Sequence, residues 1–246
     1  MFSMVITSRA NPIIKDIVRI ADKKYRKEYG LYIVEGIKSV DECIECGGEI
    51  DKIICTETFA NKYPDAVFVS EEIFAYISCE KSPQGTLALV KIPENILRPP
   101  QDNCLLLDRI RDPGNLGTII RTANAAGFAE IYTINCVDAY SPKVVRASMS
   151  GIFFVKIYSG SPEEIFSVLH DVPLICADMD GENIFDFTPP PKFCLCVGNE
   201  GSGVGDEILN RSEYKVKIPM RETCESLNAA VSAGIAMYQL KMRSKR

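Results

Sequence analysis

The sequence of 246 residues contains no tryptophan, a single histidine and no long apolar segment. We expect the histidine, His170 in the stretch SVLHDVP, to have no catalytic role, so acid–base chemistry would need other side chains. No apolar run approaches the ~20 residues that cross a bilayer, and the opening MFSMVITSRANP lacks the features of a signal peptide. These absences predict a cytoplasmic protein.

The cysteines do not suggest disulfides or metal binding. Most of the ten lie inside apolar runs, such as Cys194 and Cys196, where a free thiol behaves as a small hydrophobic residue. Cys43 and Cys46 form the only CxxC, and a zinc site would need a second ligand pair, which the sequence lacks. We predict free thiols, a CxxC on a helix and no metal cofactor.

Charge is unevenly distributed along the chain. The net charge of -5 opposes general attraction to a polyanion, but residues 15–27 hold six cations against Asp16 and Asp22. Such a run is typical either of a solvated helix face or of a patch that contacts RNA phosphates. The second interpretation assigns RNA contacts to Lys15, Arg19, Lys23 and Arg26, and we predict RNA contacts for Arg109 and Arg111 as well.

Helical and strand patterns alternate in the first part of the chain. A helix is predicted from Asn11-Pro12 and should carry the basic segment. Strand patterns follow at 31–34, 52–55, 67–69 and 86–91, and helical patterns at 36–46 and 71–78. The stretch RPPQDN at 98–103 is typical of a linker, so we predict domains at 1–98 and 99–246.

The second part repeats this alternation. Residues 104–107 are continuously apolar, which suits a strand covered on both faces of a mostly parallel sheet. A loop at 108–117, a helix at 118–126 and a strand at 131–134 follow. A helix is then expected at 142–150 and strands at 153–157, 174–177 and 193–197, so the fold class is α/β.

The last of these strands leads into a glycine-rich loop, GNEGSGVGDE at 198–207. A Rossmann-type nucleotide or methyl-donor site would need a full crossover helix of a dozen residues, but only about six residues precede the next strand at 216–218. A P-loop would need Gly-Lys-Ser or Gly-Lys-Thr, which is absent. Taken alone, the loop could also be a tight turn without a ligand.

Three stretches of the second half resemble the motifs of a known enzyme family. LLLDRIRDPGNLGTIIRTANAAGF (105–128), LCVGNEGSGVGDEI (195–208) and VKIPMRETCESLNAAVSAGIAMYQL (216–240) closely resemble the SpoU (TrmH) family of RNA ribose methyltransferases, in the SPOUT superfamily. SRANPIIKDI, LYIVEG and SPQGTLALV in the first half are similar to the substrate-binding domain attached to many members. The second resemblance is the less specific one.

The resemblance implies a fold and a partner. It implies a smaller N-terminal L30e-like α/β domain that binds RNA, and a C-terminal SPOUT domain built on a parallel sheet with helices on both faces. It also implies a C-terminal trefoil knot, of which the glycine loop is part and which holds S-adenosyl-L-methionine, and a homodimer formed through the catalytic domain. General rules of chain topology oppose a knot, so this expectation depends on the resemblance alone.

The resemblance also implies site residues. Arg121 matches the arginine that the family's mechanism uses to activate the ribose 2'-hydroxyl with an RNA phosphate. Because a guanidinium stays protonated, a clamp on that phosphate that stabilises the developing alkoxide is an equally sound role. Asn115 is either a cap of the helix at Thr118 or a site residue. The implied catalytic residues are Arg121, Asn115, Glu200, Ser226 and Asn228, and the implied donor-binding residues are Gly198, Ile218, Pro219, Met220 and Leu227.

Two further features concern the third motif. The stripe Leu227, Val231, Ile235 and Tyr238 has helical spacing and is expected to be core. Glu222 stands where the family usually has glycine, and we do not expect it to abolish donor binding.

The sequence therefore predicts an S-adenosylmethionine-dependent enzyme that methylates a ribose 2'-hydroxyl in structured RNA, with ribosomal RNA favoured. The single histidine and the lack of metal-ligand clusters fit methyl transfer, because the sulfonium is already a strong electrophile and needs mainly correct positioning. The alternatives are a transfer RNA methyltransferase and a non-catalytic RNA-binding protein on the same fold. A Rossmann-type methyltransferase or dehydrogenase is disfavoured by the short segment after the glycine loop.

Overall fold

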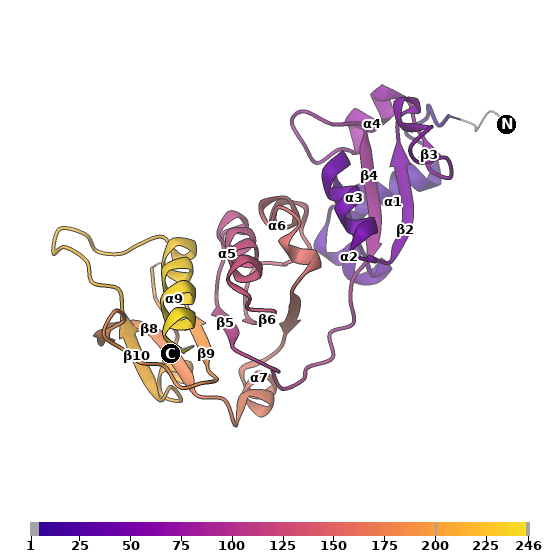
Figure 1. Cartoon of the computed structure of the whole chain (residues 1–246). Helices are drawn as coiled ribbons and strands as arrows, with labels where there is room; N and C mark the ends of the chain where they lie inside the picture. Colours follow the sequence, from indigo (N-terminus) through magenta and orange to yellow (C-terminus); the bar gives the residue numbers. More distant parts are fainter. Residues whose placement is uncertain (1–4, 200, 245–246) are drawn as a thin grey trace. The chain divides into compact units, whose positions relative to one another are not determined.

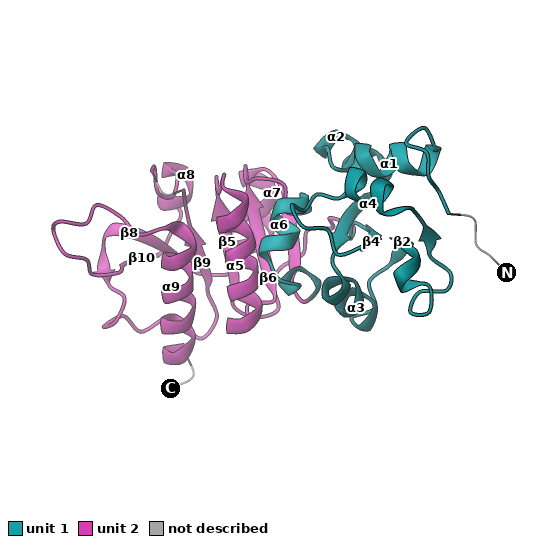
Figure 2. Cartoon of the chain, turned by 90° about the horizontal axis from the view of Figure 1, so that it is seen from above, with its two compact units in different colours: residues 1–93, 140–153 teal, residues 94–139, 154–246 magenta. Residues whose placement is uncertain are grey.

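The computed structural model describes residues 5–199 and 201–244. The chain forms two compact units (Figure 2). Unit 1 comprises Met1–Pro93 and Tyr140–Phe153, and unit 2 comprises Glu94–Ala139 and Phe154–Arg246. In sequence, the second segment of unit 1 therefore interrupts unit 2.

Unit 1 is built on a four-stranded mixed sheet (Figure 1). The strand order is β1 (Leu31–Glu35), β4 (Thr86–Lys91), β2 (Ile50–Cys55) and β3 (Val67–Phe68). β4 is antiparallel to both its neighbours, whereas β3 is parallel to β2. The helices are α1 (Pro12–Ile20), α2 (Lys23–Tyr29), α3 (Ile37–Glu45), α4 (Glu71–Ile77) and α6 (Pro142–Ala147), with short 3-10 turns at Glu57–Phe59 and Gly151–Phe153.

The basic segment of unit 1 spans two helices, not the single helix expected. α1 begins as predicted, with the Asn11 side chain accepting the Ile13 N–H at 2.9 Å, but it ends at Ile20. Asp22 then caps α2 by accepting the Lys24 N–H at 2.8 Å. A capping aspartate competes with helix continuation, which explains the break.

Arg26 is also placed differently from the prediction. Only 3% of the residue is exposed, and its guanidinium donates to the carbonyl oxygens of Ile20 (2.9 Å) and Ala21 (2.6 Å) at the end of α1. Helix-terminal carbonyls lack partners within the helix, so a buried cation there is well satisfied. Arg26 therefore ties α2 to α1, and the prediction that it contacts RNA is wrong in this conformation.

Unit 2 is built on a six-stranded sheet in which every neighbouring pair is parallel. This confirms the α/β class and the parallel sheet. The order is β10 (Tyr214–Lys217), β8 (Leu174–Asn183), β9 (Cys194–Val197), β5 (Cys104–Asp108), β6 (Glu130–Ile134) and β7 (Lys156–Ser159).

Helices cover both faces of this sheet. α7 (Pro162–Leu169) and α8 (Asp206–Leu209) pack on one face, in a core that includes Tyr132, Phe166 and Ile208. α5 (Pro113–Ala126) and α9 (Ala229–Ser244) lie side by side on the other face (Figure 2). The core on the α7 and α8 face also contains the buried thiols of Cys104, Cys176, Cys194 and Cys196. All ten cysteines of the chain are free thiols.

Several boundaries differ from those expected. α5 begins at Pro113, not at Thr118, because the Asp112 side chain accepts the Asn115 N–H at 2.8 Å and caps the helix earlier. α7, whose Ser161 and Glu164 form a capping box, was not expected. β7 lies at 156–159, not 153–157, and α6 stops at Ala147.

The apolar stripe of α9 is not core, contrary to the prediction. Val231 and Tyr238 are 50% and 49% exposed. The buried side of the helix is formed instead by Ala229, Ala230, Ala233, Ala236, Met237 and Leu240. Small alanines allow α9 to pack closely, which leaves the larger stripe outside. Over residues 5–199 and 201–244, no helix is long and apolar enough to cross a membrane.

Candidate active site

A cavity of about 550 Å³ lies in unit 2, at the carboxyl ends of β9 and β10. Its volume falls within the range typical of small-molecule sites, and parallel α/β sheets bind ligands at this edge. Part of β8, the glycine loop and the segments before and within α9 complete its wall. The apolar lining includes Val197, Val204, Leu209, Val216, Ile218, Met220 and Leu227.

The glycine loop closes tightly on itself. Asn199 and Gly203 exchange two backbone hydrogen bonds, of 3.1 and 2.8 Å, and Gly203 has a φ of 60°. A Cβ atom added at Gly198 would lie 2.1 Å from the carbonyl carbon and oxygen of Gly203. Glycine at position 198 is thus required by the approach of the chain's own backbone. The following helix, α8, has only four residues, which agrees with the argument against a Rossmann site.

Most of the predicted donor-binding residues meet at the cavity. Gly198, Ile218, Met220 and Leu227 line it. Pro219, between two lining residues, is not itself among them. Ser226 also lines the cavity, while Glu200 lies outside the described residues.

Two other predicted site residues, Asn115 and Asn228, are joined by a side-chain hydrogen bond. The Asn228 amide nitrogen donates to the Asn115 amide oxygen at 2.9 Å, which connects the start of α9 to the first turn of α5. The Asn228 oxygen accepts the N–H groups of Ala230 (3.0 Å) and Val231 (3.3 Å), so Asn228 also caps α9. Asn228 lies between the cavity-lining residues Leu227 and Ala229, and this bond extends the site to Asn115.

Arg121 lies on the exposed side of α5 and is not part of the cavity wall. Within the described ranges 5–199 and 201–244, its guanidinium makes no hydrogen bond or ion pair. A cation so placed can bind an anionic group of a ligand from solvent. This geometry fits a phosphate clamp, whereas a base role would need an unusual environment for the guanidinium.

The other predicted RNA-binding cations lie in different surroundings. Lys15, Arg19 and Lys23 are exposed on α1 and α2, and Arg19 lies 3.6 Å from Asp16. Arg111 is exposed in the loop before α5. Arg109 is partly buried, and its guanidinium contacts Asp108 and the glycine loop.

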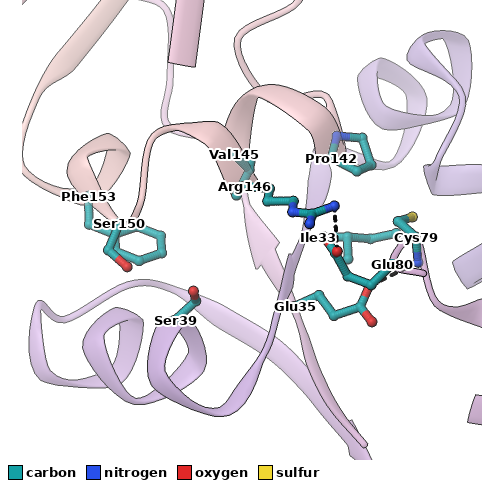
Figure 3. A pocket seen from close by; sticks show the side chains of 10 residues that line it. All are labelled: Ile33, Glu35, Ser39, Cys79, Glu80, Pro142, Val145, Arg146, Ser150 and Phe153. Carbon is teal, nitrogen blue, oxygen red and sulfur yellow. Dashed lines mark hydrogen bonds and ion pairs between the residues drawn. The ribbon is translucent and has the colours of Figure 1, made fainter. Parts of the chain in front are cut away.

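Unit 1 contains a much smaller cavity, of about 20 Å³, between β1, α3 and α6 (Figure 3). Arg146 forms an ion pair of 2.6 Å with Glu80 beside it. Glu35 accepts hydrogen bonds from the Ser78 hydroxyl and from the Cys79 N–H, the latter at 2.9 Å. Burial raises the pKa of the Glu35 carboxyl above its ordinary value, despite both hydrogen bonds. This cavity has room for a water molecule but not for a nucleoside.

One lining element was missed by the sequence analysis. Cys176 pairs with Lys215 and Glu182 with Val216, so residues 177–181 form a bulge in β8. A Cβ atom at Gly181 would lie 2.5 Å from the backbone of Val216, which explains the glycine. Ala177, Asp178 and Met179 of this bulge line the cavity. Glycine inside a strand pattern was the available signal.

The described residues contain no group of three or more His, Cys, Asp or Glu side chains placed to hold a metal ion.

Comparison with protein families gives two matches. Residues 102–238 match the model of the SpoU rRNA Methylase family, and residues 11–88 match an MRM3-like substrate binding domain.

Individual proteins are similar over nearly the whole chain. The 23S rRNA (guanosine(2553)-2'-O)-methyltransferase RlmP of Bacillus subtilis is 29% identical over 96% of this chain and 98% of its own. The 23S rRNA (uridine(2479)-2'-O)-methyltransferase of Streptomyces viridochromogenes is 26% identical, over 95% and 90%.

The fold is shared as well. The crystal structure of an AdoMet-bound rRNA methyltransferase from Sinorhizobium meliloti matches with a TM-score of 0.88 and 27% identity, over 97% of both chains. This confirms the resemblance on which the predicted fold depends. Since the family model covers more than half of the sequence, the chain belongs to the SpoU rRNA methylase family.

Proposed function

We propose that this protein transfers the methyl group of S-adenosyl-L-methionine to a ribose 2'-hydroxyl of ribosomal RNA. The observation that carries the proposal is the cavity at the glycine loop, joined through Asn228 and Asn115 to the helix that bears Arg121. The two full-length relatives named above both bear names of 23S ribosomal RNA 2'-O-methyltransferases. Their names favour ribosomal over transfer RNA.

The cavity suits the methyl donor in size and in chemistry. Its apolar walls can cover an adenine ring, and the backbone groups of the glycine loop and of residues 216–220 offer hydrogen bonds. We assign donor binding to Gly198, Ile218, Met220 and Leu227, with Pro219 fixing the turn between two of them. When bound, the donor supplies an electrophilic methyl group on a sulfonium.

The protein then has to position the ribose and stabilise the charge that develops on its oxygen. Arg121, on the exposed side of α5, would bind the phosphate next to the target ribose in a bidentate manner. The Asn115–Asn228 pair would fix the start of α9, and Ser226 would contribute a hydroxyl at the cavity wall. We also propose that Glu200 orients Arg121, on the basis of its position in the second motif alone.

RNA recognition is assigned mainly to the N-terminal region, residues 1–98, with catalysis assigned to 99–246. Lys15, Arg19 and Lys23 form an exposed basic surface in a chain of net charge -5, which suits phosphate contacts. The similarity of residues 11–88 to a substrate-binding domain supports this assignment. Arg111 would add a contact near the site.

Three further proposals concern the state of the protein. We infer a homodimer formed through unit 2, supported by the exposed apolar side chains of Val231, Tyr238 and Met242 on α9. We also infer a trefoil knot around the glycine loop, from the family resemblance, and a cytoplasmic location, where ribosomal RNA is methylated during assembly.

Incubation with isotopically labelled donor and RNA that lacks the modification tests the function. Separate pools of 23S, 16S and transfer RNA should be compared, and we expect label in 23S RNA. Label in transfer RNA alone would replace the proposed substrate. Donor binding without transfer to any pool would point to an assembly intermediate as substrate, and failure to bind the donor would favour a non-catalytic RNA-binding protein.

A further inference from the structure

Two adjacent residues at the end of β5 lie against the glycine loop. Asp108 is the last residue of β5 and is only 4% exposed. Its Oδ2 atom accepts the Gly205 N–H at 2.9 Å and the Arg109 Nε–H at 3.0 Å. A buried carboxylate is stable only when such partners compensate for its desolvation.

Arg109 adds two more bonds to the same loop. Its Nη2 donates to the Gly203 carbonyl at 3.3 Å, and its own carbonyl accepts the Asn199 side-chain amide at 3.3 Å. Arg109 has a φ of 55°, in the left-handed region that non-glycine residues rarely occupy. Strain of this kind persists only where the surroundings enforce it, and it is concentrated at functional sites.

The bonds fall at the start, middle and end of the loop, on Asn199, Gly203 and Gly205. The loop supplies much of the cavity wall, including Gly198, Gly203 and Val204. Gly205 packs closely against both side chains. A Cβ atom added at Gly205 would lie 3.2 Å from Asp108 Oδ2 and from Arg109 Nη2. Without the side chains of Asp108 and Arg109, the loop would lose the bonds at Gly203 and Gly205, while the bond from Asn199 to the Arg109 backbone carbonyl would remain.

We propose that Asp108 and Arg109 are positioning residues for the methyl donor, which hold the glycine loop in its donor-binding conformation. The inference rests on the proposed donor cavity and replaces the assignment of Arg109 to RNA. A bound arginine of this kind is committed to the loop and has fewer donors left for phosphate. Affinity for the donor would then depend on a residue pair behind the wall of the cavity.

The test compares Arg109→Ala, Arg109→Lys and Asp108→Asn with the native protein, and Arg211→Ala serves as the control. Arg211 is also in unit 2, but its guanidinium lies over the Phe166 ring, 4.3 Å from the centroid. Three quantities are measured: the Kd for S-adenosylmethionine without RNA, the Kd for RNA, and hydrogen exchange of residues 199–205.

We expect Arg109→Ala and Asp108→Asn to raise the donor Kd about tenfold or more, because each loses bonds to a charged group. The RNA Kd should stay within about twofold of the native value, and the loop amides should exchange faster. Arg109→Lys should recover only part of the donor affinity, since lysine lacks the planar fork. Arg211→Ala should resemble the native protein in all three.

Loss of RNA affinity in Arg109→Ala with an unchanged donor Kd would overturn the proposal and restore the RNA assignment. An unchanged donor Kd in Asp108→Asn and both Arg109 variants would also overturn it. If Asp108→Asn does not fold, Arg109→Lys, which keeps the buried carboxylate and its charge partner, decides the question. If the native protein itself fails to bind the donor, the donor cavity is wrong, whereas loop exchange still reports whether the pair holds the loop.

Discussion

The polar side chains of the site serve structure and chemistry together. Asn228 both caps α9 and donates to Asn115, so one amide holds a helix start and links two motifs. The family resemblance assigns both residues to the site, but the sequence does not predict this bond, because 112 residues lie between them in the chain. By sequence Asn115 is also a candidate cap of α5, but Asp112 performs that role. The local sequence does not distinguish between two nearby residues that can each cap a helix.

Arg121→Ala should lower the rate of methyl transfer at least about 100-fold, because it removes the proposed clamp on the phosphate beside the reacting hydroxyl. The donor Kd should not change, since Arg121 is not part of the cavity wall. Single-turnover transfer and donor titration measure the two effects. Asn124→Ala, also exposed on α5, is the matched control. Unchanged transfer in Arg121→Ala would remove Arg121 from the mechanism.

Asn228→Asp should separate the two roles of Asn228. Aspartate can still accept the N–H groups that cap α9, so thermal stability should be kept. It cannot donate to the Asn115 oxygen, so methyl transfer should fall. Asn228→Ala should lose both, with a stability cost of about 1 kcal/mol. Equal activity of Asn228→Asp and the native protein would show that the Asn115 bond has no catalytic consequence.

The helices and strands around the cavity can be predicted from local sequence, whereas the contacts between elements distant in sequence cannot. The hydrophobic pattern and the positions of glycine and proline predicted most strands of the parallel sheet and the shortness of α8. The bulge in β8 and the exposed stripe of α9 were not predicted, because each depends on a neighbour distant in sequence. Residues 177–181 bulge where β10 approaches Gly181. The α9 stripe was assigned to the core because helical spacing alone does not say which apolar side faces the sheet.

Gly198→Ala tests the closure of the glycine loop. The added methyl group would meet the Gly203 backbone at 2.1 Å, so the loop has to open. We expect a loss of about 2 kcal/mol or more in unfolding free energy, as for overpacked core positions, together with weaker donor binding. Gly201→Ala, where the added atom would lie 3.5 Å from the Asn199 side chain, is the control. Native donor affinity in Gly198→Ala would contradict the described loop geometry.

Glu35→Gln tests the buried carboxyl of unit 1. Burial raises the pKa of Glu35 in the folded state, so the protonated form is favoured there. The stabilisation is therefore complete below the pKa of the unfolded chain and is lost as pH rises through the higher folded pKa. Chemical unfolding at a series of pH values should show native stability falling relative to Glu35→Gln as pH rises from acid. A pH-independent difference between the two proteins would refute the burial argument.

On the scale of the whole molecule, a division into domains is predicted from local sequence patterns, whereas the oligomeric state is inferred from the family. The alternating pattern and the proline linker predict domains at 1–98 and 99–246, whereas the compact units divide after Pro93, and residues 140–153 belong to unit 1, which a linear pattern does not indicate. The proposed dimer depends on the family resemblance, because composition carries no sign of it, and Val231 and Tyr238 of α9, which support the proposal, were expected to be buried. Exposed apolar side chains on one helix are consistent with an interface between copies of the chain.

The double variant Val231→Asp, Tyr238→Asp should convert a dimer into a monomer, because charges in an apolar interface cannot be solvated. Light scattering coupled to size-exclusion chromatography measures the mass. Ile44→Asp, at an apolar residue of unit 1 that is 45% exposed, should leave the dimer intact. A dimer that survives the double variant would place the interface elsewhere.

The position of the transferred methyl group decides whether this protein is a ribose 2'-O-methyltransferase. RNA methylated with labelled S-adenosylmethionine by the native protein is digested to nucleosides and analysed by mass spectrometry. We expect label on the 2'-oxygen of a nucleoside from 23S RNA, and none when Arg121→Ala replaces the native enzyme. Label on a base nitrogen or carbon would contradict the proposed function, because the proposed role of Arg121 is to stabilise charge on an attacking ribose hydroxyl.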